Sequence, residues 1–386
     1  MTRRAIFGLA WWLAASGACR PTPDLGDPVR GLSRAERQRF ERGRVLFDSV
    51  FTPATGLGPL FNAVACGECH EDPVAGGTGD EVESHAAVFN PEAVGRPCDE
   101  LVLQGGPVFQ HEVTPLLRTA LAIDSEPIPA AATVIASRTS PDIFGFGLLD
   151  AVPDSAILAL ADPDDRNGDG ISGRPNRFFD GRLGRFGRKA LVPSLRDFND
   201  GAFVIEQGVT NPAVPDEGTV GGQPFPAGTD PAPDPELPQD VIDLVDTFVR
   251  LLAPPAPLKA SREARRGRDV FGEIGCTACH VPSLPIGDYP IRSLRGRRVA
   301  AYTDLLLHDM GPALADICFA NATPAEFRTE PLMGVRLVGR LLHDGRAATL
   351  EQAIDLHGGE GAAARDRFRA LPAADRAALV AFLETL

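Results

Sequence analysis

Apolar residues recur at helical spacing in two stretches of the chain that resemble each other. The i, i+3, i+7 spacing of one helix face occurs in Phe40, Gly43 and Phe47, and again in Ala264, Gly267 and Phe271. Ser33 and Glu36 have the spacing of a capping box before the first stretch. The pattern predicts two amphipathic helices at equivalent places in an internal repeat.

A second pair of segments, 237–252 and 371–386, matches over its whole length. Each begins with Leu-Pro, has a Phe ten residues after the Pro, and ends on Leu. Each half of the chain is therefore expected to run from an opening helix to a closing helix. The run Pro254-Pro255-Ala256-Pro257 marks the boundary, so the predicted domains span 33–255 and 256–386. The Pro/Gly-rich stretch 211–235 is predicted to be an irregular loop within the first.

The N-terminus has the pattern of a secretory signal peptide over residues 1–19. Arg3 and Arg4 precede an apolar run at 6–15, which small residues and Cys19 follow. The run is shorter than the roughly 20 apolar residues that a transmembrane helix needs. Cys19 resembles the lipid-acceptor cysteine of bacterial lipoproteins, which would anchor the protein to a membrane; ordinary cleavage nearby is the alternative. The expected location is the periplasm.

Length and charge narrow the class of protein. A chain of 386 residues suggests two or more domains, and 40 Gly with 35 Pro indicate much irregular structure. The net charge of −14 argues against nucleic acid and anionic membrane surfaces as partners. It favours basic proteins as partners.

The candidate chemistry lies in two Cys-x-x-Cys-His strings. Their residues are Cys66, Cys69 and His70, and Cys276, Cys279 and His280. This spacing is typical of c-type haem attachment, in which two thiols bind the haem vinyl groups and the His binds iron. A Cys/His zinc site is the alternative. Haem attachment in bacteria takes place outside the cytoplasm, so this interpretation requires an export signal, which the N-terminal pattern supplies. The sequence therefore predicts two covalently bound haem c groups.

The order of opening helix, haem motif and closing helix is the plan of a cytochrome c domain. We therefore expect an all-α fold of two cytochrome c-like domains, the first with large irregular insertions. Two cysteines remain outside the signal and haem motifs, Cys98 and Cys318. They either form a disulfide between the two halves, as an oxidising compartment allows, or are separate buried thiols.

Several longer strings resemble the di-haem oxidoreductase branch, often labelled thiol oxidoreductase, of the bacterial di-haem cytochrome c peroxidase superfamily. The similarity extends from about Ser33 to the end of the chain and is weakest at 71–140 and in the Pro-rich loop. The strings that carry it are Phe144-Gly-Phe-Gly-Leu-Leu149, Gly184-Arg-Phe-Gly-Arg-Lys-Ala190, Asp304-Leu-Leu-Leu-His-Asp-Met-Gly311, Leu342-His-Asp-Gly-Arg-Ala347 and Leu350-Glu-Gln-Ala-Ile-Asp-Leu-His-Gly-Gly359.

The resemblance implies a function. In this superfamily the C-terminal haem relays electrons to the N-terminal haem, which reacts with peroxide. The expected protein is a periplasmic di-haem oxidoreductase that reduces peroxide or oxidises an unknown substrate, with a small cytochrome or cupredoxin as electron donor. The alternative is a pure electron-transfer cytochrome with no substrate site.

The resemblance also implies iron ligands. His357 stands where the peroxidases place the Met that binds the electron-transfer haem, so it is expected opposite His280, with Met310 as the rival. His85 follows His70 at a separation similar to that of the removable distal His of the peroxidases. His111 is the next candidate, and an exposed loop His is the alternative for His85. His308 and His343 match motif positions and are expected to pack or to form hydrogen bonds behind the ligands.

Two further sets of side chains are candidates. Peroxide cleavage needs a group that moves a proton between the two oxygens, and the region that corresponds to the peroxidases' acid–base segment offers Glu206 and Asp197. Surface charge is the alternative for both. Asp165, Asn167 and Asp169 begin an Asp-x-Asn-x-Asp-Gly calcium loop, in which Asn176 replaces the usual twelfth-position Glu. An acidic turn without calcium is the alternative.

Overall fold

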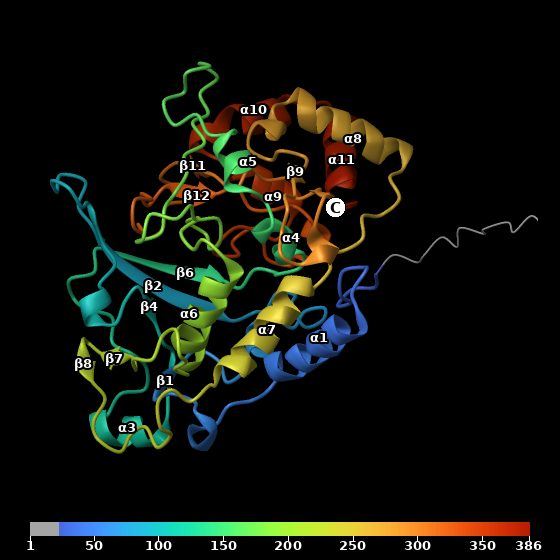
Figure 1. Ribbon diagram of the computed structural model, residues 1–386. Helices are drawn as coiled ribbons and strands as arrows, with labels where there is room; N and C mark the ends of the chain where they lie inside the picture. Colours follow the sequence, from blue (N-terminus) through green and yellow to red (C-terminus); the bar gives the residue numbers. More distant parts are fainter. Residues whose placement is uncertain (1–22) are drawn as a thin grey trace, which may run out of the picture.

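The computed structural model describes residues 23–386 and has a mixed α/β fold (Figure 1). The predicted signal peptide at 1–19, with Cys19, lies outside the described residues. Helices account for 32% of the described residues and strands and bridges for 14%, so the prediction of an all-α fold is wrong. No helix in residues 23–386 has the length and apolar character needed to cross a membrane.

The helices are mostly short. They are α1 (Arg34–Phe47), α2 (Cys66–Cys69), α3 (Pro115–Leu121), α4 (Phe146–Asp150), α5 (Asp154–Leu158), α6 (Leu195–Gln207), α7 (Gln239–Leu251), α8 (Arg262–Glu273), α9 (Leu350–Asp355), α10 (Ala362–Ala370) and α11 (Ala373–Leu383). The strands are β1 (Leu60–Phe61), β2 (Val82–Phe89), β3 (Cys98–Asp99), β4 (Val108–Phe109), β5 (Glu112–Val113), β6 (Val134–Thr139), β7 (Thr219–Val220), β8 (Gln223–Pro224), β9 (Leu284–Pro285), β10 (Arg298–Val299), β11 (Leu307–Asp309) and β12 (Glu326–Arg328).

The first predicted helix pair is present and closely packed. The α1 helix begins at the capping box of Ser33 and Glu36 and lies against α7 (Figure 1). Gly43 allows the approach, because a Cβ there would lie 2.0 Å from the carbonyl oxygen of Leu244. The rings of Phe40 and Phe248 pack beside it with centroids 5.1 Å apart.

The second half repeats this arrangement. Helices α8 and α11 cross at Gly267, where a Cβ would lie 1.8 Å from the carbonyl oxygen of Ala378. Phe271 and Phe382 pack edge to face next to the crossing, with centroids 5.5 Å apart. The internal repeat predicted from the apolar spacing is therefore a repeat of two helix crossings.

Strands were missed mainly in the insertion of the first half. Strand β2 is the centre of an antiparallel sheet and pairs with β3, β4 and β6, the last over six residue pairs from Val82↔Thr139 to Ala87↔Val134. Residues 71–140 contain neither the helix repeat nor the strongest similarity strings, so the all-α expectation left them irregular. The β-branched residues Val134, Ile135 and Thr139 of β6 favour a strand instead.

The main hydrophobic core crosses the boundary at Pro254–Pro257. It joins residues of α1, α4, α6 and α7 to buried residues of the second half such as Leu284, Leu294 and Leu306. A second core cluster lies between α8, α10 and α11.

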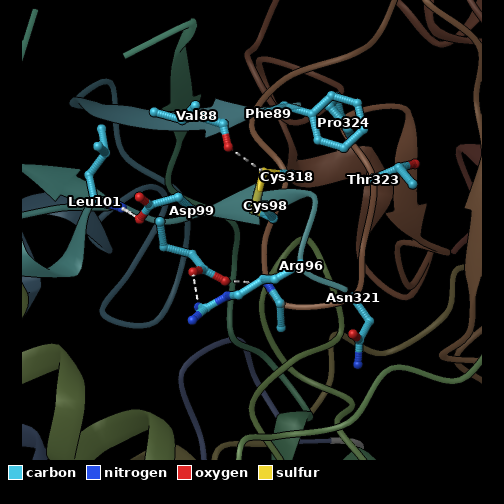
Figure 2. The surroundings of a disulfide bond; sticks show 12 residues. Val88, Phe89, Arg96, Cys98, Asp99, Leu101, Cys318, Asn321, Thr323 and Pro324 are labelled. Atoms are coloured by element: carbon cyan, nitrogen blue, oxygen red, sulfur yellow. Dashed lines mark hydrogen bonds and ion pairs between the residues drawn. A yellow bond between two sulfur atoms is a disulfide. The ribbon is translucent and has the colours of Figure 1, made fainter. Parts of the chain in front are cut away.

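A disulfide links the two halves at another place. Cys98 of β3 and Cys318 are bonded across a sequence separation of 220 residues (Figure 2). Both are buried, next to Ala87 and Ile317. The open choice between a disulfide and two separate thiols is thus settled in favour of the bond, which fastens the edge of the inserted sheet to the second half.

Candidate functional site

The first Cys-x-x-Cys-His motif forms a single helical turn after α1. Cys66 and Cys69 lie on α2, and the backbone N–H of His70 donates to the carbonyl of Cys66 at 3.2 Å. The Nδ1 atom of the His70 ring lies 3.2 Å from the carbonyl oxygen of Gly77. Phe47, at the end of α1, packs against the His70 ring with a centroid distance of 6.2 Å. The opening helix thus positions the motif.

The second motif has the same local geometry. Cys276 begins a tight helical turn, and the N–H of His280 donates to its carbonyl at 3.0 Å. The His280 Nδ1 atom lies 2.9 Å from the carbonyl oxygen of Tyr302. Phe271 of α8 contacts the His280 ring at 6.3 Å between centroids. Burial lowers the pKa of His280 to about 4, so the imidazole is neutral and its Nε2 lone pair is available to a metal.

A large, mostly apolar cavity opens beside the second motif. Cys276, Cys279 and His280 line one part of it, and His357 and Met310 line another. Nδ1 of His357 donates to the Ala353 carbonyl at 2.8 Å, which leaves Nε2 free. Gly361 lies between the two rival ligands and close to both. A Cβ atom at this glycine would lie 3.3 Å from the His357 ring and 3.4 Å from the Met310 methyl group. The sequence-predicted ligand and its rival are therefore neighbours.

These residues fit a haem. A metal-binding His generally donates its second ring nitrogen to a carbonyl or carboxylate. His70, His280 and His357 all place Nδ1 at a backbone carbonyl. Both thiols and the His of the second motif face an apolar cavity, the surroundings expected of a porphyrin.

His308 takes no such position. Its Nε2 lies 2.8 Å from Asp304 and its Nδ1 lies 2.6 Å from Glu360. Burial alone would lower the pKa of His308, but hydrogen bonds to Asp304, Cys279 and Glu360 raise it to about 12. Both ring nitrogens therefore carry protons, and His308 is a buried cation 3.5 Å from Cys279 Sγ. His308 thus forms hydrogen bonds with two carboxylates beside the second motif.

His343, the other motif histidine, also lines the cavity. Its ring stacks on Phe327 with a centroid distance of 4.4 Å, and burial lowers its pKa to about 4.

His85 and His111 lie in the inserted sheet region. His85 is buried on β2, so it is not the exposed loop residue that was the alternative for it. Its Nε2 lies 2.9 Å from the carboxylate of Glu83. His111 is exposed, with Nε2 2.7 Å from the Ser84 hydroxyl. The Nε2 atom of His85 therefore contacts a carboxylate, whereas its Nδ1 atom is buried without a hydrogen-bond partner among residues 23–386.

Glu206, at the C-terminal end of α6, lies beside the first motif. Its Oε2 accepts from Asn62 Nδ2 at 2.9 Å, and the next residue, Gln207, places Nε2 3.6 Å from Cys66 Sγ. Burial and then the charge of Glu83 raise the pKa of Glu206 well above its usual value. The surroundings of Glu206 therefore favour the protonated form of its carboxyl group.

Glu83 is the partner that sequence reasoning missed. Although burial opposes it, the hydrogen bond from His85 and the nearby charges lower the pKa of Glu83. Glu83 and Glu206 thus form a pair of carboxyl groups with opposite pKa shifts, the arrangement that assigns an acid and a base. The only sequence signal is that Glu83 stands two residues before His85, on the same face of a strand that was not predicted.

Asp197 lies at the opposite end of α6 from Glu206. It forms a bidentate pair with Arg182 at 2.8 and 2.9 Å and contacts the N-cap residue Ser194. The structure therefore brings Glu206, and not Asp197, to the first motif.

The proposed calcium ligands lie in an exposed turn. Oδ1 of Asp165 and Oδ1 of Asp169 accept from the backbone N–H groups of Gly170 and Ile171, at 3.2 and 2.9 Å. Asn167 Nδ2 donates to Asp169 at 3.1 Å. Within residues 23–386, a group of carboxylates with one oxygen each within 4.8 Å of the others is found elsewhere, at Glu217, Asp230, Asp234 and Glu236. That group lies in and directly after the Pro-rich loop.

Comparison with known proteins gives a family and a number of distant structural neighbours. Residues 129–386 match the model of the family described as "Di-haem oxidoreductase, putative peroxidase". The matched residues include the second Cys-x-x-Cys-His motif, and the first motif precedes them in the chain. No curated protein matched the chain. Hydrazine synthase of Kuenenia stuttgartiensis has a TM-score of 0.42 and 13% identity, with 100% of both chains covered.

Two further solved structures are similar at the same low level. A MauG-like protein associated with microbial copper homeostasis has a TM-score of 0.37 and 16% identity over 98% of this chain and 95% of its own. The diheme peroxidase BthA from Burkholderia thailandensis E264 has a TM-score of 0.35 and 17% identity over 90% and 86%. Because the family match covers more than half of the sequence, this chain belongs to the di-haem oxidoreductase family.

Proposed function

We propose that the protein is an exported c-type di-haem oxidoreductase of the cytochrome c peroxidase type. The observation that carries the proposal is the repeated unit of crossed helices and a Cys-x-x-Cys-His turn, whose His places Nδ1 at a backbone carbonyl. A zinc site does not need an opening and a closing helix around each motif. The signal pattern at 1–19 supports a periplasmic location, and Cys19 supports a lipid anchor.

The chain's own residues would hold the two haems. Cys66 and Cys69 would attach the first haem and Cys276 and Cys279 the second, with His70 and His280 as the proximal ligands. When bound, the haems supply one-electron chemistry, taking electrons at the C-terminal site and delivering them at the N-terminal site to peroxide or another substrate.

At the second site His357, which lines the same cavity as His280, would be the other protein ligand of the haem iron. Its Nδ1 donates to the Ala353 carbonyl, so Nε2 would be the nitrogen that binds iron. Two histidines would complete the coordination of this iron and close it to substrate, which suits a site that only transfers electrons.

At the first site Glu206 and Glu83 handle protons. The Oε2 atom of Glu206 accepts from Asn62, which leaves Oε1 as the oxygen that would carry a proton when the carboxyl group is protonated. Glu83 is ionised and is the group that can receive a proton from His85. An acid that gives a proton to one peroxide oxygen and takes one from the other is what O–O cleavage needs.

Calcium binding at Asp165, Asn167 and Asp169 is a further part of this proposal. The alternating oxygen side chains and Gly170 support it.

The second candidate is an electron-transfer cytochrome without a substrate site. His85 is the observation that favours it, because a buried His on β2, in the same electrostatic cluster as Glu83, is a candidate sixth ligand. An open iron site gives a high-spin component in the visible spectrum of the oxidised or half-reduced protein. Fully low-spin spectra in every redox state would favour the carrier.

Two variants in one helix test the acid–base assignment. We expect Glu206→Gln to lower the peroxide turnover number by roughly 10²- to 10⁴-fold, the usual contribution of general acid–base catalysis. Asp197→Asn, at the other end of α6, should change it by less than about threefold if its role is structural. Equal losses in both variants, with unchanged haem spectra, would remove Glu206 from the mechanism.

A further inference from the structure

We propose that a cationic pocket next to the second haem motif is the docking surface for a small acidic electron-transfer protein. The pocket, here named the Arg pocket, is lined by Arg265 and Arg268 of α8, by Arg298 of β10, and by Tyr302, Leu258 and Phe382. The inference rests on the proposed function, in which electrons enter at the C-terminal haem.

The charge around the Arg pocket is opposite to that of the whole chain. The protein carries a net charge of −14, whereas residues 258–302 contain nine Lys or Arg and only four Asp or Glu. The global charge favours basic partners, but the field that a docking protein meets is set by the charges within about 10 Å at physiological salt. At this face those charges are positive.

The arginines of the pocket are not neutralised by other parts of the chain. Within residues 23–386, Arg265 donates to the carbonyl of Ala260 at 2.9 Å, and Arg298 donates to the Ser283 carbonyl and hydroxyl at 2.6 and 2.9 Å. Neither of them forms an ion pair with a described carboxylate, nor does Arg268, and no Asp or Glu side chain lines the pocket. Leu386 also lines it, and its main-chain oxygen accepts a hydrogen bond from Arg336. Their charges are available to a partner.

The pocket has a direct connection to the second motif. Tyr302 lines it, and the carbonyl of the same residue accepts the hydrogen bond from Nδ1 of His280 at 2.9 Å. The Tyr302 ring packs edge to face on Phe271 at 6.0 Å and on Phe382 at 5.8 Å. A donor seated here would be separated from the proximal iron ligand by a single residue of this chain.

The pocket combines this charge with exposed apolar surface. Leu258 lines it and is 54% exposed, and the prolines of the 254–257 boundary form part of its wall. Charged groups around an apolar centre are the arrangement that steers a partner and then lets it pack.

A small anion is the other ligand that three arginines could attract. The extent of the positive charge favours a protein, because Arg262, one helical turn before Arg265 on α8, is also exposed and has no described ion pair, and the exposed Arg297 precedes Arg298 in the chain. A single small anion could not contact all of them.

The experiment measures reduction of the haems of the full-length protein by stopped-flow absorbance at low ionic strength. The donors are a reduced acidic cupredoxin and a reduced basic cytochrome c. The test variant is Arg265→Glu/Arg268→Glu on α8. The matched control is Arg37→Glu/Arg42→Glu, which makes the same charge change on exposed positions of α1, the equivalent helix of the first half.

We expect the acidic donor to reduce the wild-type protein faster than the basic donor does, with a rate constant that falls as salt is added. The α8 variant should lose about tenfold or more of that rate constant, since electrostatic steering contributes 10- to 1,000-fold. The α1 control should stay within about twofold. A basic donor that reacts faster, or equal losses in both variants, would overturn the docking surface.

Two added measurements separate the remaining outcomes. Photoreduced 5-deazariboflavin, an uncharged and strongly reducing donor, should reduce wild type and both variants at one rate; failure to reduce wild type would overturn the proposed function itself. Inorganic phosphate at constant ionic strength should not slow the acidic donor. Saturable phosphate binding that the α8 variant loses, with donor rates unchanged, would overturn the proposal in favour of a small-anion site.

Discussion

Removal of the bond between Cys98 and Cys318 should cost much of the protein's stability. We consider the variant Cys98→Ala/Cys318→Ala, which deletes the cross-link and leaves two small side chains in a buried cluster. The neighbouring contact from the N–H of Ala320 to the carboxylate of Glu100, at 2.7 Å, stays in place. The native structure around the bond is therefore expected to persist.

The magnitude follows from the length of chain that the bond closes. The two cysteines are 220 residues apart, and the chain-entropy relation gives about 5 kcal/mol at 25 °C for a closed loop of this size. The loss arises in the unfolded state, which gains the freedom that the cross-link removes. The value lies at the upper end of the measured range, because few disulfides close so long a loop.

The assay is equilibrium unfolding in urea followed by far-ultraviolet circular dichroism, for the haem-loaded wild type and variant. We expect the free energy of unfolding to fall by about 5 kcal/mol. The dependence on urea should become steeper, because the unfolded variant exposes more surface. A loss below about 1 kcal/mol with an unchanged slope would show that the cross-link does not restrict the unfolded chain and would refute the reasoning.

Four further results are expected. Replacing Cys276 and Cys279 with Ala should halve the covalently bound haem per chain after acid-acetone extraction, and an unchanged count would exclude attachment at the second motif. His357→Met should raise one midpoint potential in a spectroelectrochemical titration by an amount on the order of 100 mV, because Met ligands raise haem potentials; two unaltered potentials would move the ligand to Met310. Calcium should raise the melting temperature of chelator-treated protein, and Asp169→Ala should abolish that rise without a change in haem content. Burial and then the charges of Asp230, Asp234 and Glu236 raise the pKa of Glu217 to about 9. Folding at a pH between about 4.5 and 9 therefore takes up a proton, and the free energy of unfolding should fall as the pH rises through this range. In the presence of chelator, Glu217→Gln should make the free energy of unfolding less dependent on pH, and an unchanged pH dependence would contradict the assignment.

The parts of the fold that the sequence predicts are those with a repeated, local signal. The spacing of Phe40, Gly43 and Phe47 reports one helix face, and the same face recurs in α8, so both crossings could be anticipated. The Leu-Pro starts of α7 and α11 are equally local. The two Cys-x-x-Cys-His turns need only adjacent residues.

The parts that it does not predict depend on contacts between distant residues. Strand β2 carries Glu83, yet what makes Glu83 part of the site is Glu206, more than 120 residues later. The disulfide and the pairing of β2 with β6 are likewise long-range, and no short pattern marks them. Asp197 and Glu206 look alike as acidic residues of one helix, and only the fold distinguishes the one that pairs with Arg182 from the one beside the first motif.

The two halves differ in length, so the two helix crossings close loops of different size. The α1–α7 crossing joins Gly43 to Leu244, 201 residues apart, whereas the α8–α11 crossing joins Gly267 to Ala378, 111 residues apart. Loop-closure entropy grows only with the logarithm of loop length, so the longer first half costs about 0.5 kcal/mol more to close. Two helices that meet at a glycine can therefore enclose inserted segments of very different size. The inserted sheet of the first half, which brings Glu83 to its haem motif, could be accommodated at almost no thermodynamic cost to the crossing beneath it.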